Sequence, residues 1–434
     1  MRFATPRMID VLVFLLLLSG PPKLRVRDAT ASLRGETDAV VLLRLVVGGA
    51  GGLWIAARLY PFLVARGVLP RLALSQILSV VLLAVLSLGV FVAPGPGLTA
   101  FSIYQLAVMM GVGWLFARLY GPDVFLKYLF WGYLVLGVLV MLAWVFMPEL
   151  VVRRGRLRGD LIAPTGAIAA LGLVLCLSGA IRMKKWLFWF ASAVFSILLI
   201  ASQTRTALAA FCAAAAVALL FRYPAPIRKV FPLGVVALLL AGILDLLSVG
   251  GQFAVREEQS LATMSDRLPL WEHLLGTMMV ESPVIGLGYF SASRILGPEY
   301  NPGLGNAHSA FVEVMVGGGL VGGMLFFALY GVLVVYGVRL LLRARDYPVA
   351  YAVLGLFVIT FLMSVTNTEG IQGGPIGFTF WSVTALLPAA LEHRRQPAGV
   401  GGRTIPTPDS RDAWPPGRRR PEVGIRPLAH HDRG

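Results

Sequence analysis

Residues 265–323 read SDRLPLWEHLLGTMMVESPVIGLGYFSASRILGPEYNPGLGNAHSAFVEVMVGGGLVGG. Most of this stretch belongs to a polar, aromatic-rich segment, Val249–His308, which interrupts a succession of long apolar runs. The residues after His308 belong to the next apolar run. Binding and catalytic residues concentrate in loops that a rigid scaffold positions. We therefore interpret Val249–His308 as a large functional loop set into a bundle of hydrophobic helices.

The composition is that of a membrane protein. Of the 434 residues, 57% are hydrophobic and 14% are charged, and the mean hydropathy is +0.77. A soluble domain is nearer to half apolar and a quarter charged. The apolar runs are continuous and do not alternate, which favours helices over membrane-spanning strands. The predicted fold class is an all-α integral membrane protein.

The apolar runs predict about 12 transmembrane helices, or about 11 if the first run is removed as a signal peptide. That run has the charged start and short apolar core of a signal peptide, but it lacks a small-x-small cleavage site and contains Asp10. The predicted spans are Met8–Ser19, Ala39–Ala57, Leu72–Ala93, Leu98–Ala117, Val124–Met147, Leu161–Ile181, Trp186–Ala201, Ala207–Phe221, Val230–Leu247, Phe311–Leu342 (one long or bent span), Ala352–Val365 and Ile376–Leu391.

The uneven distribution of the net charge of +16 orients these spans. Cytoplasmic loops of membrane proteins are enriched in Lys and Arg. With the N-terminus in the cytoplasm, alternation of the spans puts most basic residues on the cytoplasmic side and Val249–His308 on the other. We expect a multi-pass protein of the cytoplasmic (inner) membrane, with both termini cytoplasmic and the functional loop extracytoplasmic.

The chain divides into two regions of different composition. Residues 1–392 form one predicted polytopic membrane domain, which includes the extracytoplasmic loop 249–308. Residues 393–434 are rich in Arg, Pro and Gly and have few large apolar groups, so we predict a disordered, basic cytoplasmic tail. Its arginines either touch anionic lipid headgroups or only reinforce the topology. Both cysteines, Cys176 and Cys212, lie in apolar runs, which argues against a disulfide framework.

Four arginines stand on the outer face, where the charge rule does not place them. Arginine suits phosphate because its planar guanidinium donates bidentate hydrogen bonds and stays charged. One interpretation is a docking surface for an anionic headgroup, with Arg156 and Arg158 as candidates. The other is a solvated turn paired with Glu149 and Asp160. The four arginines are Arg153, Arg154, Arg156 and Arg158.

Arg205 lies in ASQTRTALAAF, a polar break between two apolar spans at their outer end. A charge at that depth costs a few kcal/mol and normally faces a protein interior or a water-filled cavity with an anionic partner. We favour a bound anionic ligand over a distant acid or backbone carbonyls. Arg44, beside Gly48–Gly52, is interpreted as a snorkelling residue.

The loop itself contributes Arg267 and His308. Ser265 or Asp266 is a plausible N-cap for a helix in which Arg267 occupies the first turn. A helix N-terminus offers free amide donors and partial positive charge, which suit a phosphate. The alternative is an ion pair between Arg267 and a nearby acid. His308, at the outer membrane boundary, is a candidate proton carrier, although a lone histidine can also be structural. No His, Cys or carboxylate spacing in the sequence predicts a metal site.

Four segments resemble motifs of the O-antigen ligase and O-antigen polymerase superfamily, in that family's order. RLRGDLIAPTGAIA resembles "RxxGxxxxPNxxA", and SQTRTALAAF resembles "TxSRxAxxA". DRLPLWEHLL with SPVIGLGYF resembles "RxxxW…PxxGxGxxxF", and NAHSAFVEVMVGGGLVGG resembles "AHNxxLxxxxExGxxG". Together they cover about Arg156 to Gly323. Thr165 and Ser309 depart from the pattern, because each stands where the family prefers asparagine.

This resemblance implies a GT-C-like, metal-independent glycosyltransferase that needs no nucleotide or other cofactor. The implied donor is a glycan on undecaprenyl diphosphate, and the acceptor hydroxyl belongs to a lipid, a glycan or a protein. By motif, Arg205 and Arg267 would bind the diphosphate, and His308 would be catalytic, acting on the acceptor hydroxyl. Membrane lipids are expected partners and nucleic acid is not.

Three other functions remain open at this point. A polymerase would extend the lipid-linked chain with the same residues that a ligase would use. A lipid-linked sugar transporter, or flippase, predicts inverted repeats and charged or broken helices at mid-membrane, and the sequence shows no repeat. A non-catalytic protein of envelope assembly is the last alternative.

Overall fold

A computed structural model of the chain describes residues 6–19, 39–66, 72–153, 156–157, 164–222, 267–300, 306–343, 347–366 and 374–393. All of them belong to one compact unit, Arg2–Arg395. The predicted span Val230–Leu247, the first part of the functional loop and the predicted tail from residue 394 onward lie outside the described residues.

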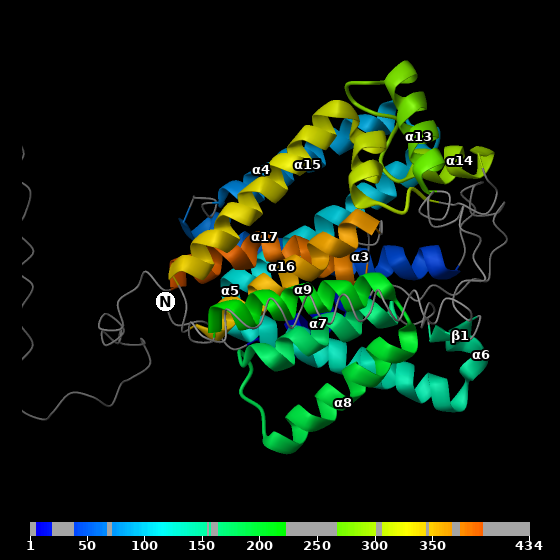
Figure 1. The fold of residues 1–434 in the computed structure, drawn as a ribbon. Coiled ribbons are helices and arrows are strands. Elements are labelled where there is room, and N and C mark those ends of the chain that lie inside the picture. Colours follow the sequence, from blue (N-terminus) through cyan, green and yellow to red (C-terminus); the bar gives the residue numbers. More distant parts are fainter. Residues whose placement is uncertain are drawn as a thin grey trace, which may run out of the picture. The chain divides into compact units, whose positions relative to one another are not determined.

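Helices account for almost all of the described structure (Figure 1). The prediction of an all-α fold is therefore confirmed, apart from one hairpin of two-residue strands, β1 (Val152–Arg153) and β2 (Arg156–Leu157). The helices are α1 (Met8–Ser19), α3 (Ala39–Arg66), α4 (Leu74–Leu88) with the 3-10 turn η1 (Gly89–Phe91), α5 (Pro96–Phe146), α6 (Pro148–Val151), α7 (Thr165–Ser178), α8 (Lys185–Ser202), α9 (Arg205–Arg222), α13 (Arg267–Glu281), α14 (Ser291–Tyr300), α15 (Ala310–Arg343), α16 (Pro348–Thr366) and α17 (Pro375–His393).

Two long helices are broken at glycines. In α5, Gly121 has φ 81° and ψ 165° and precedes Pro122, which lacks an N–H and disfavours helical geometry in the residue before it. The two halves of α5 correspond to the predicted spans Leu98–Ala117 and Val124–Met147. In α15 the break is at Gly319, with φ 63° and ψ −164°, as expected for a span predicted to be long or bent.

Within the described residues, five helices are long and apolar enough to cross a membrane, judged by length and composition. They are Leu74–Phe91, Pro96–Phe146, Lys185–Ser202, Ala310–Arg343 and Pro348–Val365. Several of the other predicted spans coincide with shorter apolar helices, such as Thr165–Ser178. These helices agree with a multi-pass membrane protein. The count of about 12 spans and the GT-C-like arrangement stay predictions.

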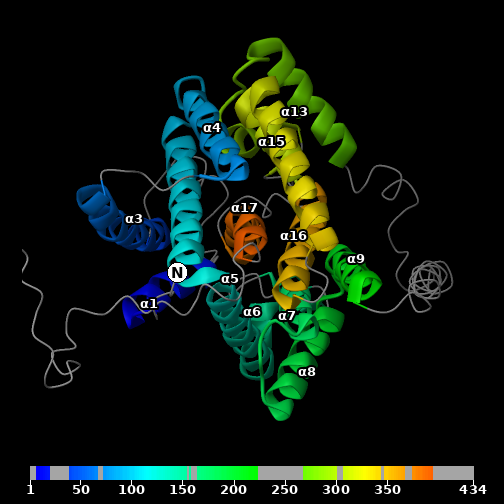
Figure 2. The ribbon, with the colours of Figure 1, turned by 90° about the vertical axis from the view of Figure 1, so that its left-hand side faces the viewer.

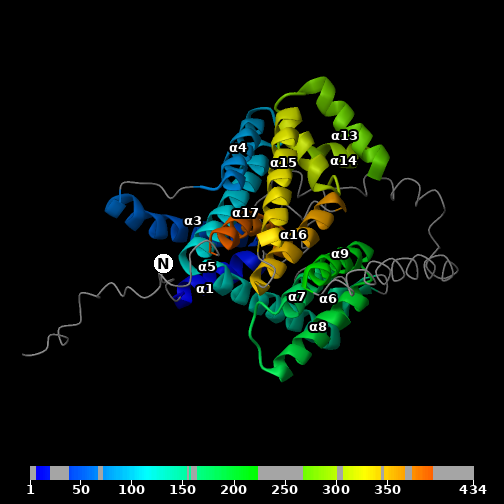
Figure 3. The ribbon, with the colours of Figure 1, turned by 60° about the vertical axis from the view of Figure 1, so that its left-hand side comes forward.

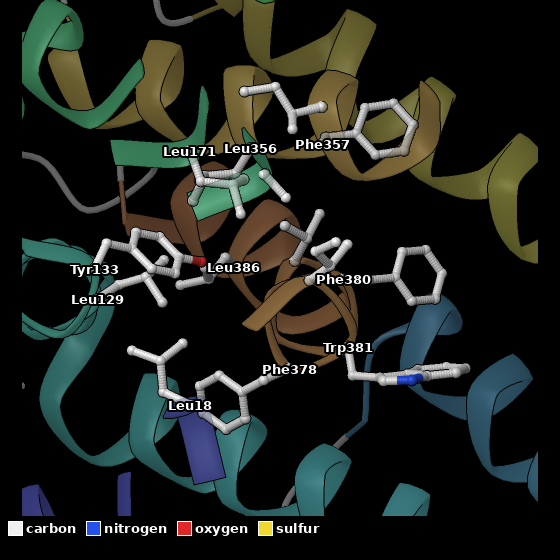
Figure 4. Close-up of a cluster of buried hydrophobic side chains, with 14 of the residues drawn as sticks. Leu18, Leu129, Tyr133, Leu171, Leu356, Phe357, Phe378, Phe380, Trp381 and Leu386 are labelled. Carbon is white, nitrogen blue, oxygen red and sulfur yellow. The ribbon is translucent and has the colours of Figure 1, made fainter. Parts of the chain in front are cut away.

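Helix α17 is the centre of the bundle, as Figure 2 shows by looking nearly along it. Every residue from Pro375 to Pro388 is buried, because α5, α16, α15, α1, α4 and α7 all pack around this helix. Figure 4 shows the core that results: Phe378 and Trp381 of α17 lie among side chains of the surrounding helices, including Leu18 of α1.

Hydroxyl groups and indoles connect α17 to its neighbours. The Ser75 hydroxyl donates to the carbonyl of Thr384 at 2.6 Å, and the Trp114 indole donates to the Thr384 hydroxyl at 2.7 Å. The hydroxyls of Tyr133 and Thr379 form a further hydrogen bond. Interhelical bonds of this kind hold membrane helices together where lipid offers no hydrophobic driving force between them.

A buried carboxylate joins the ends of α1, α3 and the first half of α5. Asp10 is fully buried, and its carboxylate accepts from the Trp54 indole at 2.6 Å, the Tyr120 hydroxyl at 2.6 Å and Arg58 Nε at 3.0 Å. The backbone N–H of Arg7 adds a fourth donor at 2.8 Å. The predicted alternation of spans puts these three helix ends on one side of the membrane, and the Asp10 network brings them together.

We predict that Asp10→Asn destabilises the protein by about 2 kcal/mol, because the substitution removes the charge that Arg58 and the neutral donors share. Thermal unfolding of the detergent-solubilised protein measures the effect. Asp123→Asn is the matched control, since Asp123 is exposed and accepts one long bond, 3.4 Å, from Tyr347. We expect this control to stay within about 0.5 kcal/mol of the native chain. Equal stability of the two variants would contradict the role of Asp10.

Candidate functional site

The site is built on an exchange of backbone hydrogen bonds between a loop and the break in α15. The N–H groups of Leu287 and Gly288 donate to the carbonyls of Val316 and Gly317, at 2.8 and 3.2 Å. In return, the N–H groups of residues 320 and 321 donate to the carbonyls of residues 283 and 284, at 2.8 and 3.4 Å. The loop thereby satisfies the groups that the break leaves without helical partners, which a membrane helix requires.

Glycines on both sides allow this exchange. Gly286 and Gly288 have φ values of 74° and 95°, and a Cβ on Gly286 would lie 2.4 Å from the backbone nitrogen of Gly319. A Cβ on Gly319 would lie 2.3 Å from the carbonyl oxygen of Val284. The loop can therefore approach the broken helix only without side chains at these positions, and this explains the pairing of GLG with GGG in the sequence.

The same loop is fixed to the end of α4 and the start of α5. The hydroxyls of Thr99, in the first turn of α5, and Ser291, the first residue of α14, lie 2.6 Å apart. A Cβ on Gly89, just after α4, would lie 3.0 Å from the Cα of Gly288. Figures 1 and 3 show the result: α13 and α14 sit together at one end of the bundle, beside the ends of α4 and α15.

Helix α13 is amphipathic, with one apolar face buried. Leu270, Leu274 and Met278 recur at helical spacing and are buried. They form a second hydrophobic core together with Ala307 and Val316, near the break in α15. This core orients α13, so that Arg267 at its first residue is held by the packing of the turns that follow.

His308 lies in a tight turn immediately before α15. Its φ is 51°, a left-handed conformation that is uncommon for a residue with a side chain. The side-chain oxygen of Asn306 accepts a hydrogen bond from the backbone N–H of His308 at 2.9 Å. The Trp271 indole, one helical turn beyond Arg267, donates to the carbonyl of Ala307 at 2.6 Å. The structure thus joins the first turns of α13 directly to the His308 turn.

Arg205 is placed differently. It is exposed at the first turn of α9, whose main packing partners are α7 and α16. Its guanidinium has no hydrogen-bond or ion-pair partner among the described residues. Figures 1 and 3 show the turn between α8 and α9 toward the same end of the bundle as α13 and α14. The described contacts therefore connect the helix that begins at Arg267 with the turn that carries His308, while Arg205 stands on a separate helix.

The turn that carries Arg205 rests on the start of α7. A Cβ on Gly166 would lie 2.8 Å from the hydroxyl oxygens of Ser202 and Thr204, so a glycine is needed for this approach. Thr165 is buried, and its hydroxyl has no hydrogen-bond partner among the described residues. Two of the sequence motifs, PTGAIA and SQTRTALAA, are in this way packed against each other.

The remaining predicted arginines are not tested by the structure. Arg156 belongs to β2 and pairs in register with Arg153 across the hairpin, but their side chains, like that of Arg44, lie outside the described residues. Arg158 is outside them entirely. Headgroup docking by Arg156 and Arg158 stays a prediction.

Sequence reasoning missed a polar cluster beneath the His308 turn. Glu313 is buried in the first turn of α15, and the Ser293 hydroxyl lies 2.9 and 2.8 Å from its two carboxylate oxygens. Tyr289, next to it, is also buried, which raises the pKa of its phenol well above the usual value, and the Glu313 carboxylate raises it further. The available signal was the single acid in the apolar run AFVEVMV, because an acid in such a run normally has a function.

The described residues contain no group of three or more His, Cys, Asp and Glu side chains arranged to hold a metal ion. The side chains of the site include guanidinium groups at one end of the bundle and an imidazole in a constrained turn. Guanidinium suits an anionic oxygen, and imidazole suits transfer of a proton near neutral pH.

The sequence profile of the family described as O-antigen ligase matches residues 190–327. The matched range runs from α8 to the part of α15 just beyond its break, and it contains Arg205, Arg267 and His308. Members of this family transfer glycans, as ligases or polymerases, from lipid-linked substrates in a membrane. No curated protein matches the chain.

We predict that Gly319→Ala destabilises the protein by roughly 2–6 kcal/mol, because it adds backbone strain and a clash with the carbonyl of Val284. Gly276→Ala in α13 is the matched control: a Cβ there meets nothing within 4 Å, so we expect up to about 1 kcal/mol of stabilisation. Thermal unfolding in detergent compares the two. A native-like melting temperature for Gly319→Ala would rule out the backbone exchange.

Proposed function

The chain belongs to the O-antigen ligase/polymerase superfamily, and from this membership we propose that it is a glycosyltransferase that moves a glycan from an undecaprenyl-diphosphate carrier to an acceptor hydroxyl. Transfer takes place on the outer face of the cytoplasmic membrane and is ligase-like. The observation that carries this proposal is the contact of Trp271 with Ala307, within the matched range, which joins the helix that starts at Arg267 to the turn of His308.

Arg205 and Arg267 bind the diphosphate of the donor. As the bond between the anomeric carbon and the diphosphate oxygen breaks, negative charge grows on that oxygen. Fixed guanidinium groups stabilise this charge more in the transition state than in the ground state, and only such differential binding accelerates the reaction. The exposure of Arg205 and the lack of a partner for it among the described residues support this role.

His308 acts as the general base. Its neutral imidazole accepts the proton of the acceptor hydroxyl while that oxygen forms a bond to the anomeric carbon. The donor loses undecaprenyl diphosphate, and the new glycosidic bond joins the glycan to the acceptor. Attack on the side opposite the leaving group inverts the anomeric carbon. No nucleotide takes part, because the diphosphate linkage already activates the sugar.

The donor combines an apolar polyprenyl tail with a polar glycan. A site at one end of the bundle suits such a substrate, because that end can lie at the boundary between bilayer and water. The polyprenyl tail stays in the bilayer, the diphosphate lies at the boundary, and the glycan meets its acceptor outside. The residues named here serve a polymerase equally well, since a polymerase differs in its acceptor, which is a second lipid-linked glycan.

Reconstitution of the full chain in liposomes with an undecaprenyl-diphosphate glycan tests the proposal. With an added lipid, glycan or protein acceptor, a ligase yields glycosylated acceptor and free undecaprenyl diphosphate. Elongated lipid-linked glycan without added acceptor would instead assign a polymerase. Movement of the donor across the bilayer with no new glycosidic bond would contradict transfer and favour a transporter.

We predict that His308→Ala lowers the transfer rate by about 10²–10⁴-fold, the usual contribution of a general base. Arg205→Ala and Arg267→Ala should each lower it by about 10²–10³-fold, as expected for loss of one group that stabilises a developing anion. The rates are measured in the same liposomes at equal protein amounts.

His273→Ala is the control for His308→Ala. His273 also lies on the outer segment but stacks on Tyr300, with ring centroids 5.4 Å apart, and it has no role in the proposed chemistry. We expect its rate to stay within about threefold of the native protein. Near-native transfer by His308→Ala would show that His308 is not the base.

A further inference from the structure

The backbone immediately before His308 is held from two different helices. The carbonyl of Ala307 accepts the Trp271 indole of α13 at 2.6 Å, and the backbone N–H of Ala307 lies near the Glu313 carboxylate of α15 and interacts favourably with it. Ala307 itself is fully buried. Side chains of α13 and α15 therefore lie at both polar groups of this residue, and the left-handed His308 follows directly. A residue in that conformation persists only where its surroundings determine it.

Glu313 is anchored on its other side by the segment that leads into α14. The Ser293 hydroxyl lies within 2.9 Å of both carboxylate oxygens, and the backbone N–H of Phe290 interacts favourably with the same carboxylate. The positive charge of Arg294, whose guanidinium lies 4.3 Å from the centre of the Phe290 ring, acts on this carboxylate too. One side chain thus ties residues 290–294 to residue 307.

A carboxylate is costly to bury, and an apolar residue of similar volume often serves packing as well or better. What an apolar residue cannot supply is an acceptor for the Ser293 hydroxyl and a negative charge near the N–H groups of Ala307 and Phe290. Glu313 is only 1% exposed, so an acceptor sugar cannot reach it as a base. Its contribution to the site therefore acts through the turn that carries His308.

We propose that Glu313 is a positioning residue which, together with Trp271, fixes the orientation in which His308 takes the proton of the acceptor hydroxyl. This inference rests on the proposed function. The pairing of Glu313 with Ser293 and of Trp271 with Ala307 holds the imidazole in place, whereas the chemistry stays with His308 and the arginines.

The test is a double-mutant cycle in the reconstituted full chain. Glu313→Gln keeps the shape of the side chain but replaces one acceptor oxygen with a donor, and Trp271→Phe keeps a ring but removes the indole N–H. We expect each change to lower kcat by about 10- to 100-fold, the effect of a misplaced catalytic group, with the KM for the donor within about twofold. In a His308→Ala background, Glu313→Gln should lower the residual rate by less than about twofold, because residues that act as a unit are not additive.

A second readout does not depend on transfer. Diethyl pyrocarbonate modifies histidines, and peptide mass spectrometry follows His308 and His273 separately. We expect Glu313→Gln and Ser293→Ala to change the modification rate of His308 by about threefold or more, since the turn loses its fixed geometry, while His273 is unaffected. Ser79→Ala is the control, because Ser79 is fully buried but donates to the carbonyl of Ser75, at 2.7 Å, within α4.

The outcomes separate the two proposals. The positioning role would be overturned if Glu313→Gln lowered the transfer rate by the same factor in the native and the His308→Ala backgrounds. It would also be overturned if Glu313→Gln left both the transfer rate and the rate of His308 modification at native values. If Glu313→Gln fails to fold, Ser293→Ala and Trp271→Phe replace it in the same cycle. If the native chain transfers no glycan, the proposed function fails, and the modification rates alone decide whether Glu313 fixes the His308 turn.

Discussion

The exchange of backbone hydrogen bonds between residues 283–288 and the break in α15 is the constraint on which the end of the bundle that carries α13 and α14 depends. A helix that stops and restarts leaves N–H and C=O groups unsatisfied, and a membrane offers no water to bind them. Here the loop after α13 supplies both the missing donors and the missing acceptors. Glycines are required on both sides of this contact, because a Cβ on Gly286 or Gly319 would clash with the opposing backbone.

That contact determines where the functional groups lie. It brings the end of α13 and the start of α14 against α15, which leaves room for the His308 turn between the indole of Trp271 and the carboxylate of Glu313. The bundle behind it is organised around α17, which is buried from Pro375 to Pro388. The arrangement therefore combines a rigid apolar body with a polar segment that is bound to it by backbone groups, and the imidazole belongs to that segment.

The sequence predicted the apolar body well, because continuous apolar runs and helix N-cap residues are local signals. The long or bent span Phe311–Leu342, the two halves of α5 and the helix that begins at Arg267 all follow from such signals. Contacts between distant residues do not. No local sequence pattern around Glu313 predicts its contact with Ser293. Likewise, none around Leu287 predicts its hydrogen bond to the carbonyl of Val316. The left-handed φ of His308 could not be predicted from the sequence either, because it depends on contacts with residues distant in the chain.

The most direct test of the account is an experimental structure of the full chain with an undecaprenyl-diphosphate glycan bound, determined in a lipid nanodisc with the His308→Ala variant to prevent turnover. The account predicts the diphosphate between Arg205 and Arg267 and the anomeric carbon next to the turn of residue 308. A diphosphate bound at the opposite end of the bundle, or one that contacts neither arginine, would contradict it.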